Sequence, residues 1–231
     1  DRLADSDRQR REFVANISHD LRTPLTSLLG YLETLSLKAD RLTMEENKQY
    51  LNIALRQGNK VRHLSQQLFE LARLEHGGIK PQPETFVLAE LVQDVAQKFD
   101  LPVATRNIGL QLELAAGLPP VTADLSMIER VLTNLLDNAI RHTPEGGGIR
   151  LAARRAGPEI IVEVADSGPG IAGELRATLF ERPSVLEPGA QSASRGGLGL
   201  MIVRRMLQLH GGDIRLLEAP AGACFQFTLP V

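Results

Sequence analysis

The feature that most constrains the fold is a change of apolar pattern after residue 76. Residues 1–76 contain only two glycines, and their apolar residues recur every three or four positions, which places them on one face of a helix. This spacing predicts two amphipathic helices, with a turn near 38–43 where Thr43 and Glu46 are spaced as a capping box for the second helix. Residues 77–83 (Gly-Gly-Ile-Lys-Pro-Gln-Pro) end the pattern and predict a linker.

Two helices joined by a short loop are expected to pack antiparallel, but such a hairpin encloses no core of its own. A second copy would bury the apolar seam in a four-helix bundle, so residues 1–76 are predicted to form a homodimer. The pattern alone also allows the alternative of a helical spacer packed on the rest of the chain.

Residues 84–231 alternate between helical and strand patterns. The expected helices and strands cover 88–99 (helix), 108–114 (strand), 124–141 (helix), 149–153 and 160–165 (strands), 200–210 (helix), 214–217 and 225–229 (strands). The turn Ala156-Gly157-Pro158 is too short for a parallel crossover, so the strands on either side should form a hairpin. The expected fold class is therefore α+β: a helical hairpin followed by an α/β sandwich with a mixed, largely antiparallel sheet.

Composition excludes several classes of function. The 231 residues carry a formal net charge of −2, so the chain lacks the basic balance that releases counterions from nucleic acid, and no nucleic-acid partner is expected. A single cysteine, Cys224, excludes an intramolecular disulfide and disfavours a structural zinc site. No run of about 18 apolar residues could span a bilayer. The sequence begins at Asp1 in a charged stretch without Met, as expected for a part of a longer protein.

A polar turn follows the strand expected to end at residue 165. In 166–170 (Asp-Ser-Gly-Pro-Gly), Asp166 could accept a hydrogen bond from an exocyclic amine, while Gly168 and Gly170 would let the backbone approach a flat base. Residues 168–173 also match the dinucleotide fingerprint G-x-G-x-x-G. However, Pro169 has no N–H for a pyrophosphate, and the expected hairpin is not a parallel crossover. An ordinary Asp-Gly turn is the commoner explanation of this motif taken alone.

The helix expected at 124–141 carries Asn134, Asn138 and Arg141 on a face beside its apolar stripe. Asparagine is a mediocre helix former, so two of them one turn apart cost helix propensity. Neutral amide oxygens suit a Mg²⁺ ion whose other ligands are phosphates and waters, and Arg141 could bind a phosphate. A solvated polar face is an equally open explanation.

Residues 195–200 (Arg-Gly-Gly-Leu-Gly-Leu) predict a glycine-rich turn before the helix that ends at His210. Free N–H groups at a helix N-terminus attract phosphate, although the segment lacks the Walker sequence. The aperiodic polar stretch 182–194 is interpreted as a mobile lid. Gly211-Gly212 should stop the helix, where His210 is interpreted as a cation that suits a C-terminus.

The order of these segments resembles the ATP-binding fold shared by sensor histidine kinases, gyrase, MutL and heat-shock chaperone ATPases. The segments that correspond to its N, G1, F and G2 boxes are 134–139 (Asn-Leu-Leu-Asp-Asn-Ala), 166–170, 179–182 (Leu-Phe-Glu-Arg) and 197–200 (Gly-Leu-Gly-Leu). Upstream, 13–25 (Phe-Val-Ala-Asn-Ile-Ser-His-Asp-Leu-Arg-Thr-Pro-Leu) resembles the H box of the histidine kinases alone. The resemblance covers nearly the whole chain.

The resemblance implies that the chain uses ATP and Mg²⁺ to phosphorylate His19, and that the phosphoryl group passes to an aspartate of a response-regulator receiver domain. In autophosphorylation, the resemblance implies that Asp20 is the base. A second implied reaction is phosphatase activity on the regulator, in which Thr23 would position the hydrolytic water. The implied parts are a dimerising, histidine-bearing hairpin (1–76), a linker (77–83) and an ATP-binding domain (84–231). The implied setting is the cytoplasmic portion of a bacterial inner-membrane sensor, with membrane contact only through segments outside this sequence.

Nucleotide contacts are also implied by the resemblance. The residues concerned are Asn134, Asn138, Arg141, His142, Asp166, Gly168, Gly170, Ile171, Phe180, Arg195, Gly197, Leu198, Gly199 and Leu200. Asn138 and Asn134 are the implied metal ligands among them.

The chemistry of the H box agrees with these roles. His19 and Thr23 lie one helical turn apart, and Asp20 is the adjacent acid. A phosphoacceptor imidazole must be neutral and exposed, and a nearby carboxylate can take the proton of one ring nitrogen while the other attacks phosphorus. Pro24 removes a donor to the carbonyl of Asp20, so the helix is expected to bend one turn past the histidine.

Three positions depart from the family pattern. Arg195 stands where the first glycine of the G2 box is usual, His142 where an aromatic residue often follows the basic one, and Pro183 where the F box usually continues with an aromatic residue. These departures bear on nucleotide affinity and lid order. Two other classes of function remain open: an ATPase of the gyrase or chaperone type, and a non-catalytic dimeric signalling module.

Overall fold

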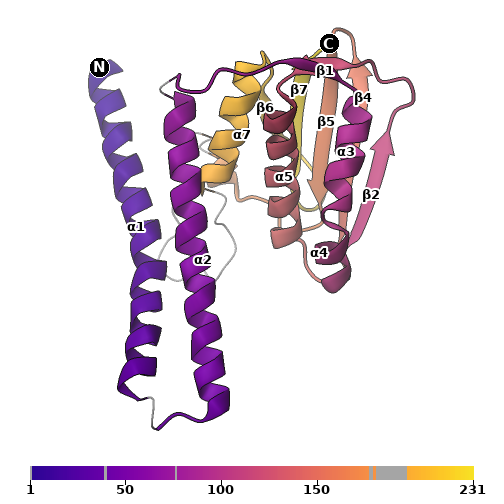
Figure 1. The fold of residues 1–231 in the computed structure, drawn as a ribbon. Coiled ribbons are helices and arrows are strands. Elements are labelled where there is room, and N and C mark those ends of the chain that lie inside the picture. Colours follow the sequence, from indigo (N-terminus) through magenta and orange to yellow (C-terminus); the bar gives the residue numbers. More distant parts are fainter. Residues whose placement is uncertain (1, 39–40, 76, 177–178, 181–196) are drawn as a thin grey trace. The chain divides into compact units, whose positions relative to one another are not determined.

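A computed structural model describes residues 2–38, 41–75, 77–176, 179–180 and 197–231 (Figure 1). The chain divides into two compact units, Asp1–Ala72 and Arg73–Val231, and each is described by itself. Among the described residues, no helix combines the length and apolar character needed to cross a membrane.

The first unit is the predicted helical hairpin. Helix α1 spans Arg2–Leu37 and α2 spans Met44–Glu75, so the last turn of α2 belongs to the second unit. The two helices run side by side (Figure 1), and the rings of Tyr31 and Tyr50 meet between them with centroids 5.6 Å apart. Helix α1 continues through Pro24, and the bend expected there stays a prediction.

The predicted capping box at the start of α2 is confirmed. The backbone N–H of Glu46 donates to Thr43 Oγ1 at 3.2 Å, and the backbone N–H of Thr43 donates to Glu46 Oε2 at 2.9 Å. The hydrogen bonds from Thr43 lower the pKa of the Glu46 carboxyl. At its other end α2 stops at Glu75, just before Gly77 adopts a φ of 66° and the N–H of Gly78 donates to the Arg73 carbonyl at 3.0 Å.

The second unit is an α/β sandwich. Its elements are β1 (Glu84–Phe86), α3 (Leu88–Gln97), α4 (Asp100–Thr105), β2 (Gly109–Leu114), β3 (Val121–Ala123), α5 (Leu125–His142), β4 (Gly148–Ala156), β5 (Glu159–Asp166), α6 (Gly173–Arg176), α7 (Gly197–Leu209), β6 (Ile214–Leu217) and β7 (Cys224–Pro230). Strands β2-β4-β5-β7-β6 form one sheet in which only the β2–β4 pair is parallel. The expectation of a mixed, largely antiparallel sheet is therefore confirmed.

Helices α3, α5 and α7 lie on one face of this sheet (Figure 1). The buried stripe of α5 and the inward side chains of the central strands form the core, in which Phe225 and Phe227 are the largest fully buried residues. The β4–β5 hairpin turns at Gly157, whose φ is 63°, as the turn 156–158 predicts. Its register pairs Ile149 with Asp166, which places Asp166 at the open end of the hairpin.

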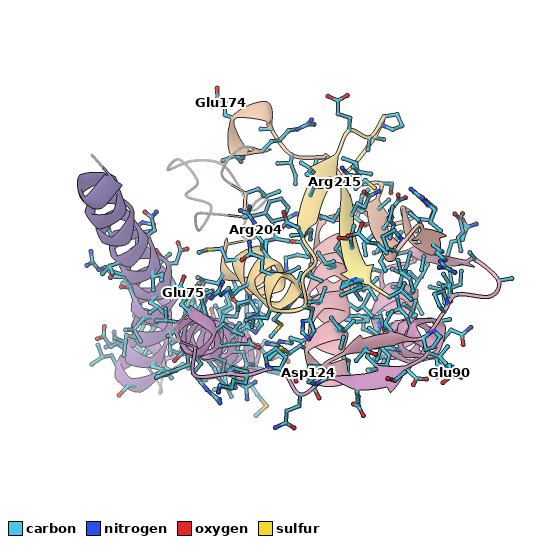
Figure 2. All side chains as sticks on the ribbon, turned by 90° about the horizontal axis from the view of Figure 1, so that it is seen from above. Glu75, Glu90, Asp124, Glu174, Arg204 and Arg215 are labelled. Carbon is cyan, nitrogen blue, oxygen red and sulfur yellow. The ribbon has the colours of Figure 1, made fainter. Side chains whose placement is uncertain are left out.

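On the other face of the sheet, one polar residue from each strand forms a hydrogen-bonded row. In the strand order β2-β4-β5-β7-β6, these residues are Glu113, Arg150, Glu163, Gln226 and Arg215. Arg150 bonds to Glu113 at 3.3 Å and to Glu163 at 3.4 Å. Gln226 donates to Glu163 at 2.7 Å and accepts from Arg215 Nε at 2.8 Å (Figure 2 labels Arg215). Cross-strand polar pairs of this kind stabilise a sheet.

Three features of the fold differ from the sequence expectations. The helix expected over 88–99 is divided into α3 and the short α4, and the three-residue strands β1 and β3 form a separate sheet. The glycine-rich segment 197–200 is the first turn of α7 and not a turn before it. Leu198 and Leu200 are each only 4% exposed, and their burial offsets the cost of about 1 kcal/mol for glycine inside a helix.

Candidate functional site

Asp166 is a buried acidic residue of the candidate site, and backbone hydrogen bonds fix its side chain. It ends β5 and is only 7% exposed. Its Oδ1 accepts hydrogen bonds from the backbone N–H of Gly168 at 2.8 Å and of Ala223 at 3.3 Å. Burial raises the pKa of the Asp166 carboxyl, and these backbone hydrogen bonds partly oppose that shift. With Oδ1 held by two donors, Oδ2 is the oxygen available to a donor on a ligand.

Glycines around Asp166 allow very close approaches of the backbone. A β-carbon on Gly168 would lie 2.7 Å from the His142 carbonyl oxygen, and one on Gly170 would lie 2.9 Å from the Gly222 carbonyl oxygen. A β-carbon on Gly222 itself would lie 1.6 Å from the Asp166 carbonyl oxygen. The two glycines selected from the sequence are therefore positions where a larger residue would displace the Asp166 loop.

Sequence reasoning missed Gly222 and Ala223, which close this site from the β6–β7 hairpin. Besides its bond to Oδ1, Ala223 accepts from the Asp166 backbone N–H at 2.9 Å. Gly222 has a φ of 72°. A glycine just before the last strand was the only signal in the sequence, and it does not reveal that β7 lies beside β5.

Asn134 and Asn138 lie one turn apart on α5, and both are half-buried. The Nδ2 atom of Asn134 is buried and has no hydrogen-bond partner within the described residues. A buried amide without a hydrogen-bond partner costs roughly 1–3 kcal/mol of stability. Such amides are rare in folded proteins, and a ligand that supplies the missing partner is one explanation. The unpartnered Nδ2 is a donor that suits an acceptor such as a phosphate oxygen. The neutral amide oxygens of the two asparagines, one turn apart, are ligands that a Mg²⁺ ion shares with phosphates.

The C-terminal end of α5 meets the 166–170 loop. Arg141 is exposed and pairs with Asp137 at 2.6 Å, one turn earlier on the helix. The His142 side chain is half-buried. Burial and then the nearby Arg141 lower the pKa of His142, against smaller opposing effects of Asp166 and Asp137. His142 thus presents a neutral ring beside the Asp166 carboxylate near pH 7.

Arg106 is a third residue that sequence reasoning missed. Its guanidinium donates to the carbonyls of Ile140 and Thr143, the latter at 2.8 Å, and so satisfies orphan carbonyls at the end of α5. It therefore supports the helix end on which Arg141 and His142 stand.

The remaining predicted nucleotide contacts occupy the start of α7 and the segments beside α6. Gly197 and Gly199 are in the first turn of α7, and the side chains of Leu198 and Leu200 point into the core, so any ligand contact there would come from the backbone. Ile171 is half-buried. The ring of Phe180 packs edge-on against that of Phe225, with the ring centroids 6.2 Å apart. Arg195, Pro183 and the expected lid 182–194 lie outside the described residues.

His19 stands on α1 in the first unit with an exposed side chain, at 72% of its full accessibility. Its Nδ1 lies 3.6 Å from Asp20 Oδ1. The Thr23 hydroxyl donates to the backbone carbonyl of His19 at 3.2 Å. The H-box residues thus lie within one turn, with the imidazole open to solvent and its Nδ1 facing a carboxylate.

Comparison with known families matches both units. Residues 123–231 match the family described as "Histidine kinase-, DNA gyrase B-, and HSP90-like ATPase", and residues 9–77 match the "His Kinase A (phospho-acceptor) domain". Together these matches include His19, the asparagines of α5 and the Asp166 loop.

Individual relatives are similar over most of the chain. The alginate biosynthesis sensor protein KinB of Pseudomonas aeruginosa is 34% identical over 97% of this chain, which spans 38% of KinB. The solved catalytic domain of histidine kinase ThkA is 32% identical, with a TM-score of 0.57 over 64% of this chain and 95% of that domain. ThkA in complex with the response regulator protein TrrA is 27% identical, with a TM-score of 0.77 over 99% of this chain and 66% of ThkA. The chain therefore belongs to the sensor histidine kinases and contains their phospho-acceptor and ATP-binding domains.

Proposed function

We propose that residues 84–231 bind Mg²⁺-ATP, that the γ-phosphoryl group is transferred to His19, and that the phosphohistidine then passes it to an aspartate of a response-regulator receiver domain. The observation that carries this proposal is the buried Asp166, whose Oδ1 is held by Gly168 and Ala223 while Oδ2 is left for a ligand donor. An exocyclic amine of adenine is such a donor. The complex of the relative ThkA with a response regulator supports the second transfer.

The nucleotide would be held by groups from three elements. Asp166 would accept from the adenine amine, and the flanking glycines would let the backbone approach the base. Asn138 and Asn134 would offer amide oxygens to Mg²⁺, which neutralises charge on the phosphates when bound. Backbone N–H groups in the first turn of α7 would face the phosphates. Arg141 and His142 would add contacts from the end of α5, together with Ile171, Phe180 and Arg195.

The geometry of the H box supports different roles for the two ring nitrogens of His19. Nδ1 faces Asp20, so the Nδ1 proton would pass to that carboxylate while Nε2 attacks the γ-phosphorus. The bond from the γ-phosphorus to the β–γ bridging oxygen breaks, and ADP leaves with that oxygen. Because phosphoryl transfer depends mainly on positioning and charge neutralisation, correct delivery of the phosphoryl group to the exposed imidazole is decisive. In the separate dephosphorylation of the regulator, Thr23 would position the water that attacks the aspartyl phosphate and releases inorganic phosphate.

Residues 1–76 would form the homodimer and 77–83 the linker. Exposed apolar side chains form one stripe on each helix of the hairpin. The stripe residues are Val14, Leu25, Leu29 and Leu32 on α1, and Leu51, Leu55 and Phe69 on α2. At 3.6 residues per turn, the members of each stripe fall within about 60° of one another. A second copy of the hairpin would bury both stripes in a four-helix bundle.

The sensor names of the relatives support a cellular setting for the whole protein. The chain would be the cytoplasmic portion of a bacterial inner-membrane sensor. Fractionating cells that express the complete gene product tests this, because a signal only in the soluble fraction would contradict it.

Incubation of the 231-residue chain with γ-labelled ATP and Mg²⁺ tests the proposed reaction. We expect acid-labile, base-stable label on the wild type and none on His19→Gln. Undiminished label on His19→Gln, or steady phosphate release without any phosphoprotein, would contradict the proposal and favour an ATPase. A folded dimer without measurable ATP binding would instead indicate a non-catalytic signalling module.

A further inference from the structure

One carboxylate in the second unit ties the linker to the helix that carries the two asparagines. Asp124 precedes α5, and its Oδ1 accepts from the backbone N–H of Met127 at 3.0 Å as the N-cap of that helix. Its other oxygen, Oδ2, accepts from the backbone N–H of Gln82 in the linker at 2.9 Å. Figure 2 labels Asp124. One oxygen of this side chain therefore bonds to the first turn of its own helix, and the other bonds to a residue 42 positions earlier in the chain.

The same residue is bonded to the end of α7. The backbone N–H of Asp124 donates to His210 Nε2 at 3.0 Å, and His210 Nδ1 lies 2.8 Å from the Met206 carbonyl oxygen. A carbonyl only accepts and an amide N–H only donates, so Nδ1 carries the proton and Nε2 is the acceptor. The ring is neutral in this arrangement, and the sequence interpretation of His210 as a cation at the helix end is corrected.

The bonds of Asp124 thus join three segments, which we call the linker node: Gln82 of the linker, the first turn of α5, and His210 after α7. Helix α5 carries Asn134 and Asn138, and the first turn of α7 is the glycine-rich segment 197–200. The linker leads from the phospho-acceptor hairpin into the ATP-binding unit. The linker backbone is therefore hydrogen-bonded, through Asp124, to the start of α5 and to the residue after α7.

We propose that Asp124 and His210 are positioning residues for phosphoryl transfer. By holding the linker backbone on the helices of the nucleotide site, the node restricts how the ATP-binding unit can present its nucleotide to His19. This inference rests on the proposed function. The node raises the rate of transfer within the ATP complex and leaves the affinity for ATP unchanged, because it lies at the start of α5 and beyond the end of α7, ten residues from Asn134 and from Leu200.

Two variants of the 231-residue chain remove the linker bond from opposite sides. Asp124→Asn keeps one acceptor oxygen for the helix cap but presents an NH₂ group toward the Gln82 N–H. Gln82→Pro removes the donor itself and leaves Asp124 intact. Gln82→Ala is the matched control, because the bond comes from the backbone and the side chain takes no part in it.

We expect Asp124→Asn and Gln82→Pro each to lower the autophosphorylation rate at saturating ATP at least threefold, with the Kd for ATP within twofold of the wild type. Gln82→Ala should match the wild type in both measurements. In Asp124→Asn, hydrogen exchange of the Gln82 amide should accelerate about tenfold, a factor that corresponds to loss of one hydrogen bond. This exchange measurement does not depend on activity.

The His210 side of the node has its own pair of variants. His210→Gln keeps a side-chain acceptor for the Asp124 N–H and should retain at least half of the wild-type rate, whereas His210→Leu should lose at least threefold. Unchanged rates in both Asp124→Asn and Gln82→Pro, or a weakened Kd for ATP with an unchanged saturated rate, would overturn the inference. Failure of the proposed function is distinguishable, because the wild type itself would then acquire no label.

Discussion

The carboxylate of Asp166 accepts a hydrogen bond at 2.8 Å from the backbone N–H of Gly168, two residues along the chain. This bond and the one from Ala223 hold Oδ1, and burial raises the pKa of the carboxyl despite both. A charged group kept in an environment that penalises its charge is typical of a binding residue and not of a stabilising one. Burial of this carboxyl therefore costs the local structure some stability, which the proposed contact of Oδ2 with a ligand would explain.

The first prediction is that Asp166→Asn trades nucleotide affinity for stability. An amide replaces one acceptor oxygen by a donor, so the Kd for ATP should rise at least tenfold in calorimetric titration. The raised pKa of Asp166 means that its charge costs stability above that pKa and costs nothing below about pH 4. The melting temperature of the variant at pH 7 should therefore equal or exceed that of the wild type, and any gain should vanish on acidification.

Asp94→Asn serves as the control for this prediction, because Asp94 is an exposed carboxylate on α3. It should leave both the affinity and the melting temperature unchanged. An Asp166→Asn protein that binds ATP as tightly as the wild type would refute the adenine role.

The second prediction concerns Gly222→Ala. The new β-carbon would collide with the Asp166 carbonyl, and the residue would also have to keep a positive φ. We expect a loss of about 3 kcal/mol or more in the free energy of unfolding, measured by urea denaturation, together with weakened ATP binding. Gly157→Ala is the matched control, since Gly157 also has a positive φ but has no atom within 4 Å of a β-carbon. It should cost only about 1–2 kcal/mol, and equal losses in the two variants would contradict the collision argument.

The third prediction is that Asn134→Leu stabilises the unliganded protein. The Nδ2 atom of Asn134 is buried without a partner among the described residues, so an apolar side chain of similar size removes that cost. The free energy of unfolding should rise by about 1 kcal/mol without nucleotide. The stabilisation that Mg²⁺-ATP gives to the wild type should be lost in the variant. A variant that is less stable without nucleotide and still stabilised by Mg²⁺-ATP would count against both the orphaned amide and the metal role.

The fourth prediction is a pH dependence that arises from His142. Burial and Arg141 lower the pKa of His142 in the folded chain, while the unfolded value is about 6.5. Below about pH 6.5 the unfolded state therefore binds a proton that the folded state does not, and stability falls with falling pH until the folded pKa is reached. His142→Phe removes this contribution. In urea denaturation, the wild type should lose more stability than His142→Phe between pH 7.5 and 5.5, and parallel losses would show that His142 is not the source.

Much of the fold follows from residues that lie close together in the sequence. The capping box of Thr43 and Glu46 joins residues three apart, and the end of α2 before Gly77 depends on one turn of backbone. The hairpin at Gly157 likewise needs only its own turn residues. Short elements were missed for the same reason: β1 and β3 have three residues each, too few for a period to show, and they exist only because they pair with each other.

The sequence by itself determined the two amphipathic helices, the mixed sheet and the motifs that carry the chemistry, because helix spacing, caps and turns depend on neighbours within a few residues. Only the tertiary structure decided which groups complete the site. Ala223 holds Asp166 from 57 residues away, and His210 meets Asp124 from 86 residues away. Both contacts arise because β7 lies beside β5 and α7 packs against α5. Such pairings depend on the packing of whole elements in three dimensions, which no local pattern of residues records.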